Sequence, residues 1–222
     1  LDTEDRPPAP VSIEHVIRAA EGATVPPLVR LPVADYASIT RALDSGAQGF
    51  VAHGVRTAEE ARAAFQKARY APAGQRDITG GRTTCFGTLP LKDYLQQANR
   101  EILVVLMIED LEGLKNRDAI LNVPGVDWVL PGAVDLSQFL GCPGEPLHPE
   151  VTNAIDELAS SCRDLPVAFC ALPRTPDQLN QWHEWGARVF LLGEDRSLLF
   201  RHLKSHLASC RSDSADRQGF SS

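Results

Sequence analysis

The feature that most constrains the fold of this chain is a series of six short, mostly apolar runs. They lie at residues 28–31, 49–52, 102–108, 128–130, 167–169 and 189–192. Each run is apolar at consecutive rather than alternate positions, which is typical of strands that are covered on both faces, as in a parallel sheet. Strands that alternate with helices predict a parallel sheet joined by crossover helices.

Between these runs, apolar residues recur with the three- to four-residue spacing of helices. We expect helices at residues 13–20, 36–43, 57–68, 90–98, 112–121, 149–160, 176–185 and 196–209. Thr57 and Glu60 have the spacing of a capping box, and Gly22 and Gly46 stand where glycines commonly end helices. The polar stretch 212–222 lacks this periodicity, so we expect residues 1–211 to form a single domain that is followed by a flexible tail.

The absence of a glycine fingerprint after the first run argues against a dinucleotide-binding fold. We therefore predict an α/β fold, a (β/α)8 TIM barrel. Six or seven strands fall short of eight, so we expect an N-terminal piece to be missing upstream of Leu1; the family resemblance described below implies that this piece is the first strand and its helix. The glycine-rich connection 71–89 is long for such a fold, and long loops in compact domains are often functional.

Composition excludes several classes of protein. With 22 basic and 29 acidic residues the formal net charge is −7, which does not suit a protein that neutralises nucleic-acid phosphates. No apolar run approaches the roughly 20 residues that a membrane-spanning helix needs, and no signal-peptide pattern is present. The five cysteines are widely spaced and include no CxxC pair. We expect reduced thiols and a cytoplasmic protein that binds neither membranes nor nucleic acid.

Polar residues lie at the ends of the apolar runs, where barrel enzymes carry their active sites. They are Asp2, Glu4 and Asp5 at the very start, Arg30 near the end of the first run, His53, Glu109 and Asp135 after the next three runs, and Glu194 and Asp195 after the last one. Carboxylate oxygens suit Mg²⁺ or Mn²⁺, and an arginine can hold a substrate carboxylate or a developing enolate. Simpler roles remain open: a helix cap for Asp135, an ion pair with a lysine for Glu109, and a loop hydrogen bond for His53.

The chain resembles the HpcH/HpaI aldolase family in many short stretches that keep one register from Asp2 to about Leu199. They are residues 2–4, 28–32, 41–47, 57–62, 68–76, 94–99, 108–109, 123–127, 134–137 and 148–150. The resemblance implies a (β/α)8 barrel that assembles as a hexamer, a dimer of trimers that exchange a terminal helix. It also implies metal-dependent cleavage or formation of a carbon–carbon bond next to a 2-oxo acid such as pyruvate.

The resemblance assigns roles to individual residues. Glu109 and Asp135 match the metal ligands, for which we expect Mg²⁺, with Mn²⁺ or Co²⁺ as alternatives. Arg30 matches the arginine that steadies the enolate oxygen. Gly132 and Ala133 lie where backbone amides bind the substrate carboxylate, although the family usually has Gly-Pro there.

The acid–base residue is the main departure from the family pattern. Asp2 matches the aspartate that orients a catalytic histidine, but Asp5 stands where the family has that histidine. An imidazole titrates near pH 6.5 and an unperturbed Asp near 3.9, so Asp5 is a different acid–base group. His53 replaces a usual proline and Met107 a substrate-binding glutamine. We therefore name Asp5 and His53 as the candidates for proton transfer.

Three functions fit this set of residues. The first is a lyase or aldolase that acts through a metal-bound enolate of pyruvate or oxaloacetate. The second is a condensing enzyme that joins oxaloacetate and acetyl-CoA, as in the branch of the family with a siderophore-pathway citrate synthase. Macrophomate synthase represents a further oxaloacetate-using branch. The third is a non-catalytic homologue that has kept the fold and the site.

Overall fold

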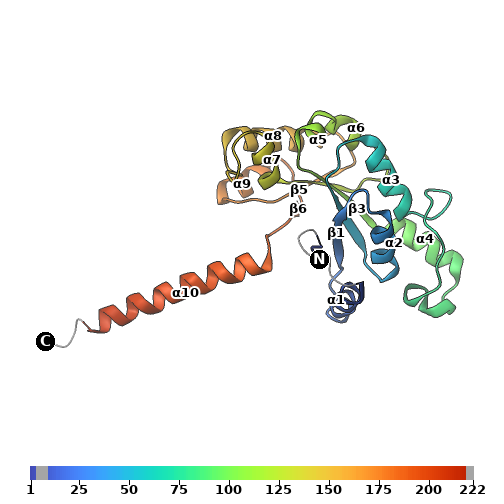
Figure 1. Ribbon diagram of the computed structural model, residues 1–222, viewed down its shortest axis with the longest axis horizontal. Helices are drawn as coiled ribbons and strands as arrows, with labels where there is room; N and C mark the ends of the chain where they lie inside the picture. Colours follow the sequence, from blue (N-terminus) through green and yellow to red (C-terminus); the bar gives the residue numbers. More distant parts are fainter. Residues whose placement is uncertain (4–9, 219–222) are drawn as a thin grey trace.

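Six parallel strands form the centre of the computed structural model, which describes residues 1–3 and 10–218 of the chain (Figure 1). They are β1 (Leu28–Pro32), β2 (Gly49–His53), β3 (Leu103–Ile108), β4 (Trp128–Pro131), β5 (Ala168–Ala171) and β6 (Val189–Phe190). Strands that are consecutive in the chain pair in parallel, from β1 with β2 through to β5 with β6. This sequential order is that of a TIM barrel, so the predicted fold class is confirmed.

Residues 1–3 lie beside β1 and continue the sheet on that side. Asp2 and Arg30 form a parallel bridge, and the Arg30 amide donates to the carbonyl of Leu1 at 2.7 Å. The hydroxyl of Thr3 donates to the carbonyl of Arg30 at 2.6 Å. The start of the chain is therefore held next to the strand that carries Arg30.

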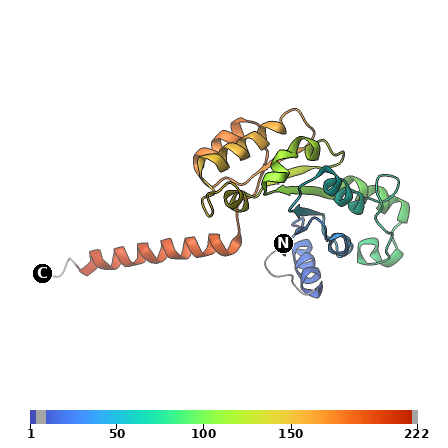
Figure 2. The ribbon, with the colours of Figure 1, turned by 45° about the horizontal axis from the view of Figure 1, so that its top comes forward.

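Helices connect the strands and lie around the sheet, as Figures 1 and 2 show. They are α1 (Pro10–Gly22), α2 (Tyr36–Asp44), α3 (Ala58–Ala68), the 3₁₀ helix η1 (Arg82–Gly87), α4 (Leu91–Glu101), α5 (Leu111–Lys115), α6 (Arg117–Leu121), α7 (Ala133–Phe139), α8 (Pro149–Ser161), α9 (Pro176–Glu184) and α10 (Asp195–Gln218). The last of them, α10, extends away from the rest of the molecule as a single rod.

Apolar side chains cover both faces of the sheet. The larger cluster packs strand residues such as Phe50 and Leu106 against the helices. A smaller cluster on the other face consists of Val105, Met107, Leu130 and Cys170. Coverage on both faces explains why the strands are apolar at consecutive positions.

Helix boundaries follow local signals in most places. Thr57 and Glu60 form the predicted capping box of α3, and Gly46, with a φ of 104°, follows the end of α2. The segment expected as one helix at 112–121 is divided at Asn116 into α5 and α6. Helix α7 was not predicted, and α10 continues to Gln218, into the segment that we expected to be a tail.

Two further expectations concern the membrane and the thiols. Within residues 1–3 and 10–218, no helix combines the length and the apolar character needed to cross a bilayer. Of the five cysteines, Cys142, Cys162 and Cys170 are buried, whereas Cys85 and Cys210 are exposed.

Candidate active site at the carboxyl ends of the strands

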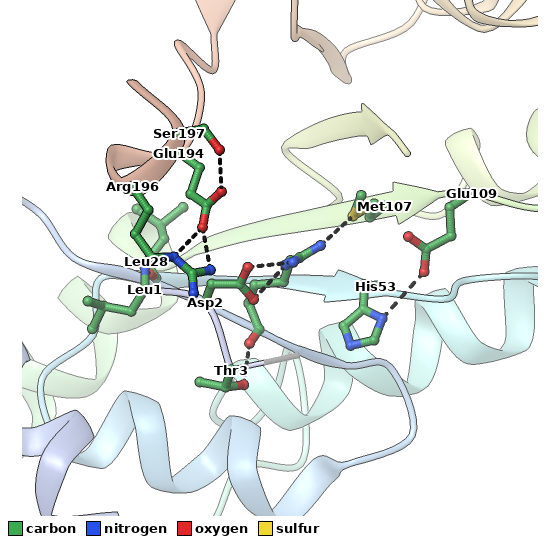
Figure 3. A network of polar contacts seen from close by, with 11 residues as sticks. Leu1, Asp2, Thr3, Leu28, His53, Met107, Glu109, Glu194, Arg196 and Ser197 are labelled. Carbon is green, nitrogen blue, oxygen red and sulfur yellow. Dashed lines mark hydrogen bonds and ion pairs between the residues drawn. The ribbon is translucent and has the colours of Figure 1, made fainter. Parts of the chain in front are cut away.

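The polar residues predicted from the sequence meet where β1 to β4 end. His53 is the last residue of β2, Glu109 directly follows β3, and Asp135 lies in the first turn of α7, which follows β4. Arg30 lies on β1, where it pairs in register with Val51 of β2. Parallel pairing brings the carboxyl ends of these strands to one edge, and Figure 3 shows His53 and Glu109 of this group side by side.

Arg30 is held by contacts on two sides of its guanidinium group. Its Nε donates to Asp2 Oδ1 at 2.9 Å, and its Nη2 donates to Asp2 Oδ2. Its Nη1 faces the sulfur of Met107 at 3.8 Å, and a thioether accepts hydrogen bonds only weakly. The two-point contact with Asp2, which is labelled in Figure 3, fixes the plane of the guanidinium group.

The contact with Arg30 bears on the predicted proton-transfer residues. The family resemblance implied that Asp2 orients a catalytic acid–base residue. In the structure, the carboxylate of Asp2 forms an ion pair with Arg30. Asp5, the candidate at the family histidine position, lies outside the described residues. Its role stays a prediction from sequence.

Glu109 and His53 form a mostly buried pair. His53 Nδ1 and Glu109 Oε1 are 3.3 Å apart, and their side chains are 15% and 11% exposed. Among the described residues no lysine pairs with Glu109, so the simple alternative of a lysine ion pair is wrong. The second oxygen, Glu109 Oε2, is buried and accepts no hydrogen bond from the described residues. A buried carboxylate oxygen without a donor is costly, which favours a cation at this position.

Gly132 leaves space beside that oxygen. A Cβ atom at position 132 would lie 2.4 Å from Glu109 Cβ and 2.9 Å from Glu109 Oε2. Only glycine therefore fits here without moving the carboxylate. The Gly132 amide donates to the carbonyl of Ile108 at 2.9 Å, so it is already used by the protein. Two backbone amides were predicted to bind the substrate carboxylate, those of Gly132 and Ala133. Only the amide of Ala133, the first residue of α7, stays a candidate for this contact.

Asp135 is close enough to this group to be affected by its charges. Burial and then the negative charge of Glu109 raise the pKa of Asp135, while Arg30 and His53 partly oppose the rise. The N-cap of α7 is Gly132, so Asp135 does not serve as the helix cap that remained open from the sequence. Two carboxylates that disfavour each other's charge form a site that a cation would stabilise.

The donor set suits a hard divalent cation. Glu109 and Asp135 provide carboxylate oxygens, and Glu109 Oε2 has the space beside Gly132. In the described part of the chain no group of three or more His, Cys, Asp or Glu side chains is arranged to bind a metal ion. Two carboxylates completed by substrate and water are a usual arrangement for Mg²⁺, so the residues present fit such an ion.

Two contacts of this site were not predicted from the sequence. One is the pair of His53 and Glu109, and the other is the contact between Met107 and the guanidinium group of Arg30. The positions of the strands could have indicated the pair of His53 and Glu109, because His53 ends β2 and Glu109 follows β3, the strand that pairs with β2. Residues at the ends of neighbouring parallel strands are natural contact partners.

Comparison with known proteins gives a consistent result. A family model described as HpcH/HpaI aldolase/citrate lyase matches residues 1–201. The chain is 31% identical over 218 residues to a 2-keto-3-deoxy-L-rhamnonate aldolase from Klebsiella pneumoniae subsp. pneumoniae, a match that covers 98% of this chain and 82% of the relative.

Solved structures agree with this result. The citrate synthase SbnG superposes with a TM-score of 0.88 at 34% identity, covering 97% of this chain and 84% of that chain. An HpcH/HpaI aldolase from Desulfitobacterium hafniense superposes with a TM-score of 0.87 at 30% identity, covering 95% of this chain and 82% of that one.

Proposed function

The chain belongs to the HpcH/HpaI aldolase/citrate lyase family and is a carbon–carbon lyase, and from this premise we propose that it acts through the enolate of pyruvate or oxaloacetate. One observation carries the proposal. The fixed cation of Arg30 and the carboxylates of Glu109 and Asp135 meet at one edge of the sheet, and Glu109 Oε2 is buried without a donor among the described residues. This arrangement suits a small dianionic enolate that needs positive charge on both sides.

We propose Glu109 and Asp135 as the ligands of the divalent cation on which this family generally depends, with Mg²⁺ as the first choice and Mn²⁺ or Co²⁺ as alternatives. When bound, such a cation supplies Lewis-acid polarisation of the keto and carboxylate oxygens of a 2-oxo acid. The two carboxylates hold the ion, and the Ala133 amide at the start of α7 is the proposed donor to the substrate carboxylate.

Arg30 and Asp2 act as one unit in this mechanism. Asp2 accepts from Nε and Nη2 of Arg30, so the guanidinium group cannot turn freely as negative charge develops on the enolate oxygen. A donor that is already oriented stabilises that charge without reorganisation. For proton transfer at the substrate hydroxyl we propose Asp5, because it stands at the family histidine position.

A second candidate is a citrate synthase-like condensation of oxaloacetate with acetyl-CoA. It is favoured by the structural similarity to the citrate synthase SbnG. In this reaction oxaloacetate would be the electrophile, and the same residues would polarise its keto group. Asp5 stands where the aldolases of the family have a histidine, and this difference also favours condensation, because a condensing enzyme does not need the proton transfer that the histidine performs in aldolases. A place in siderophore biosynthesis belongs to this second candidate.

Two assays distinguish these candidates. With Mg²⁺ present, we expect pyruvate release from 4-hydroxy-2-oxo acids, because cleavage leaves the stabilised enolate as product. Pyruvate is measured with a coupled dehydrogenase. The parallel assay follows thiol release from acetyl-CoA with oxaloacetate, and a signal there alone would select condensation. Silence in both assays, combined with tight binding of the enolate mimic oxalate, would support a non-catalytic homologue instead.

We also propose that α10 joins copies of this chain into trimers and hexamers. Leu199, Phe200, Leu203 and Leu207 are 60%, 68%, 55% and 51% exposed on this helix. Their spacing of three and four residues places them on one side of the helix. A helix that extends from the body with an uncovered apolar stripe is expected to pack against another copy.

The assembly prediction is tested by replacing part of this stripe. Leu203→Lys with Leu207→Lys is expected to lower the mass measured by light scattering to that of a smaller oligomer or monomer, because charges in an apolar contact are costly. Ser205→Lys serves as the matched control, because it adds a lysine at an exposed position on the opposite side of the same helix. An unchanged mass for the double variant would contradict the role of α10.

A further inference from the structure

We propose that His53 positions the carboxylate of Glu109 for cation binding: it engages Oε1 through Nδ1 and so leaves Oε2 turned to the ion. This inference rests on the proposed function, because it assigns a task to a residue beside the proposed cation site. It makes His53 a positioning residue, in contrast to the proton-transfer role that the sequence suggested. The contact is visible in Figure 3.

The backbone fixes where the two side chains meet. His53 is the last residue of β2 and Glu109 follows β3, and these strands pair in parallel through Ala52 and Leu106. The atoms Nδ1 and Oε1 are 3.3 Å apart between side chains that are 15% and 11% exposed. Because little water reaches the pair, this contact is a main determinant of how the carboxylate is oriented.

A carboxylate accepts hydrogen bonds but donates none when ionised, so the hydrogen in this contact belongs to Nδ1 of His53. The contact therefore makes the two oxygens of Glu109 inequivalent. Oε1 receives the imidazole N–H, whereas Oε2 is buried beside Gly132 and accepts nothing from the described residues. The same carboxylate would otherwise rotate and present either oxygen.

The surroundings of His53 agree with a positioning role. Among the described residues, Glu109 and Asp135 bring carboxylates near it, and the charge of His53 affects Asp135. A Cβ at Gly54 would lie 3.7 Å from Glu109 Oε1, so the backbone after His53 also approaches this oxygen. Groups that hold a ligating carboxylate in place typically change metal affinity about 10–100-fold when they are removed.

The test compares two replacements of similar size in the full-length protein. Asn carries an amide N–H at about the position of Nδ1, whereas Leu fills volume and donates nothing. Binding of Mn²⁺ is measured by titration with electron paramagnetic resonance of the free ion. His53→Leu is expected to weaken binding about 10–100-fold, and His53→Asn should recover most of that loss. His183→Leu, an exposed position on α9, controls for the loss of a histidine.

Each outcome decides for or against the inference. Equal Mn²⁺ affinity in wild type and His53→Leu would overturn it, as would equal losses for Leu and Asn. Turnover at saturating Mn²⁺ should return to near the wild-type rate in His53→Leu. A persistent deficit of about 10²–10⁴-fold there would instead identify proton transfer and overturn the positioning role. If Glu109→Gln also binds Mn²⁺ as wild type does, the proposed cation site itself fails.

Discussion

Replacing either proposed ligand, by Glu109→Gln or Asp135→Asn, is expected to abolish the metal-dependent activity while the fold persists. Each substitution keeps the shape of the side chain but removes the charge that a divalent cation needs. Turnover should fall to the background of the assay, and Mn²⁺ binding should be lost in parallel. Both effects are measured on the same protein samples, by activity with Mg²⁺ and by Mn²⁺ titration. Asp118→Asn, whose carboxylate is 80% exposed on α6, is the matched control.

Asp135→Asn is also expected to change the thermal stability of the metal-free protein. Burial and the charge of Glu109 raise the pKa of Asp135, so the folded protein binds a proton at Asp135 more tightly than the unfolded chain does. Stability therefore falls as the pH rises through the range in which Asp135 ionises. Asp135→Asn lacks this penalty and should melt at the wild-type temperature or above it at neutral pH, with a smaller difference in acid. A large drop would instead make Asp135 a structural partner of a buried cation.

Arg30→Leu is expected to lower kcat about 10²–10³-fold while Mn²⁺ binding stays close to wild type. Loss of one oriented donor to a developing oxyanion has an effect of that size. The measurement is kcat at saturating metal together with the Mn²⁺ titration. Asp2 would lose its contact with Arg30, but its side chain is 49% exposed, so the effect on folding should be small.

Arg30→Lys separates charge from orientation. Lysine keeps the positive charge but cannot make the two-point contact with Asp2, so an intermediate kcat is expected. Arg18→Leu, a 52% exposed position on α1, controls for loss of an arginine elsewhere. If Arg30→Leu weakened Mn²⁺ binding as strongly as Glu109→Gln does, Arg30 would be part of the cation site rather than a stabiliser of the enolate.

Most of the sheet could be predicted from the sequence because its strands are buried on both faces. Consecutive apolar residues mark such strands clearly, and all six were found. Helix α7 was not among the predicted helices; the only sign of it was the helix cap left open for Asp135, and the helix begins earlier, with Gly132 as its N-cap. The division at Asn116 was missed because the apolar spacing continues across it.

The residues of the site were predictable where they follow a strand, but their contacts were not. Arg30, Glu109 and Asp135 could be listed from the strand ends alone. The pair of His53 with Glu109 depends on the register between β2 and β3, which single-strand patterns do not contain. The Asp2–Arg30 pair likewise depends on residues 1–3 lying beside β1.

Met107 has a consequence for the evolvability of this enzyme. Its side chain belongs to the smaller apolar cluster on one face of the sheet, and the same side chain contacts the guanidinium group of Arg30. A mutation of Met107 therefore alters interior packing together with the surroundings of Arg30. Truncation to alanine at a buried methionine costs about 2–5 kcal/mol, whereas a swap to leucine usually costs less than about 1.5 kcal/mol. Changes at Met107 are thus accessible mainly through residues of similar volume, or after stabilising changes elsewhere.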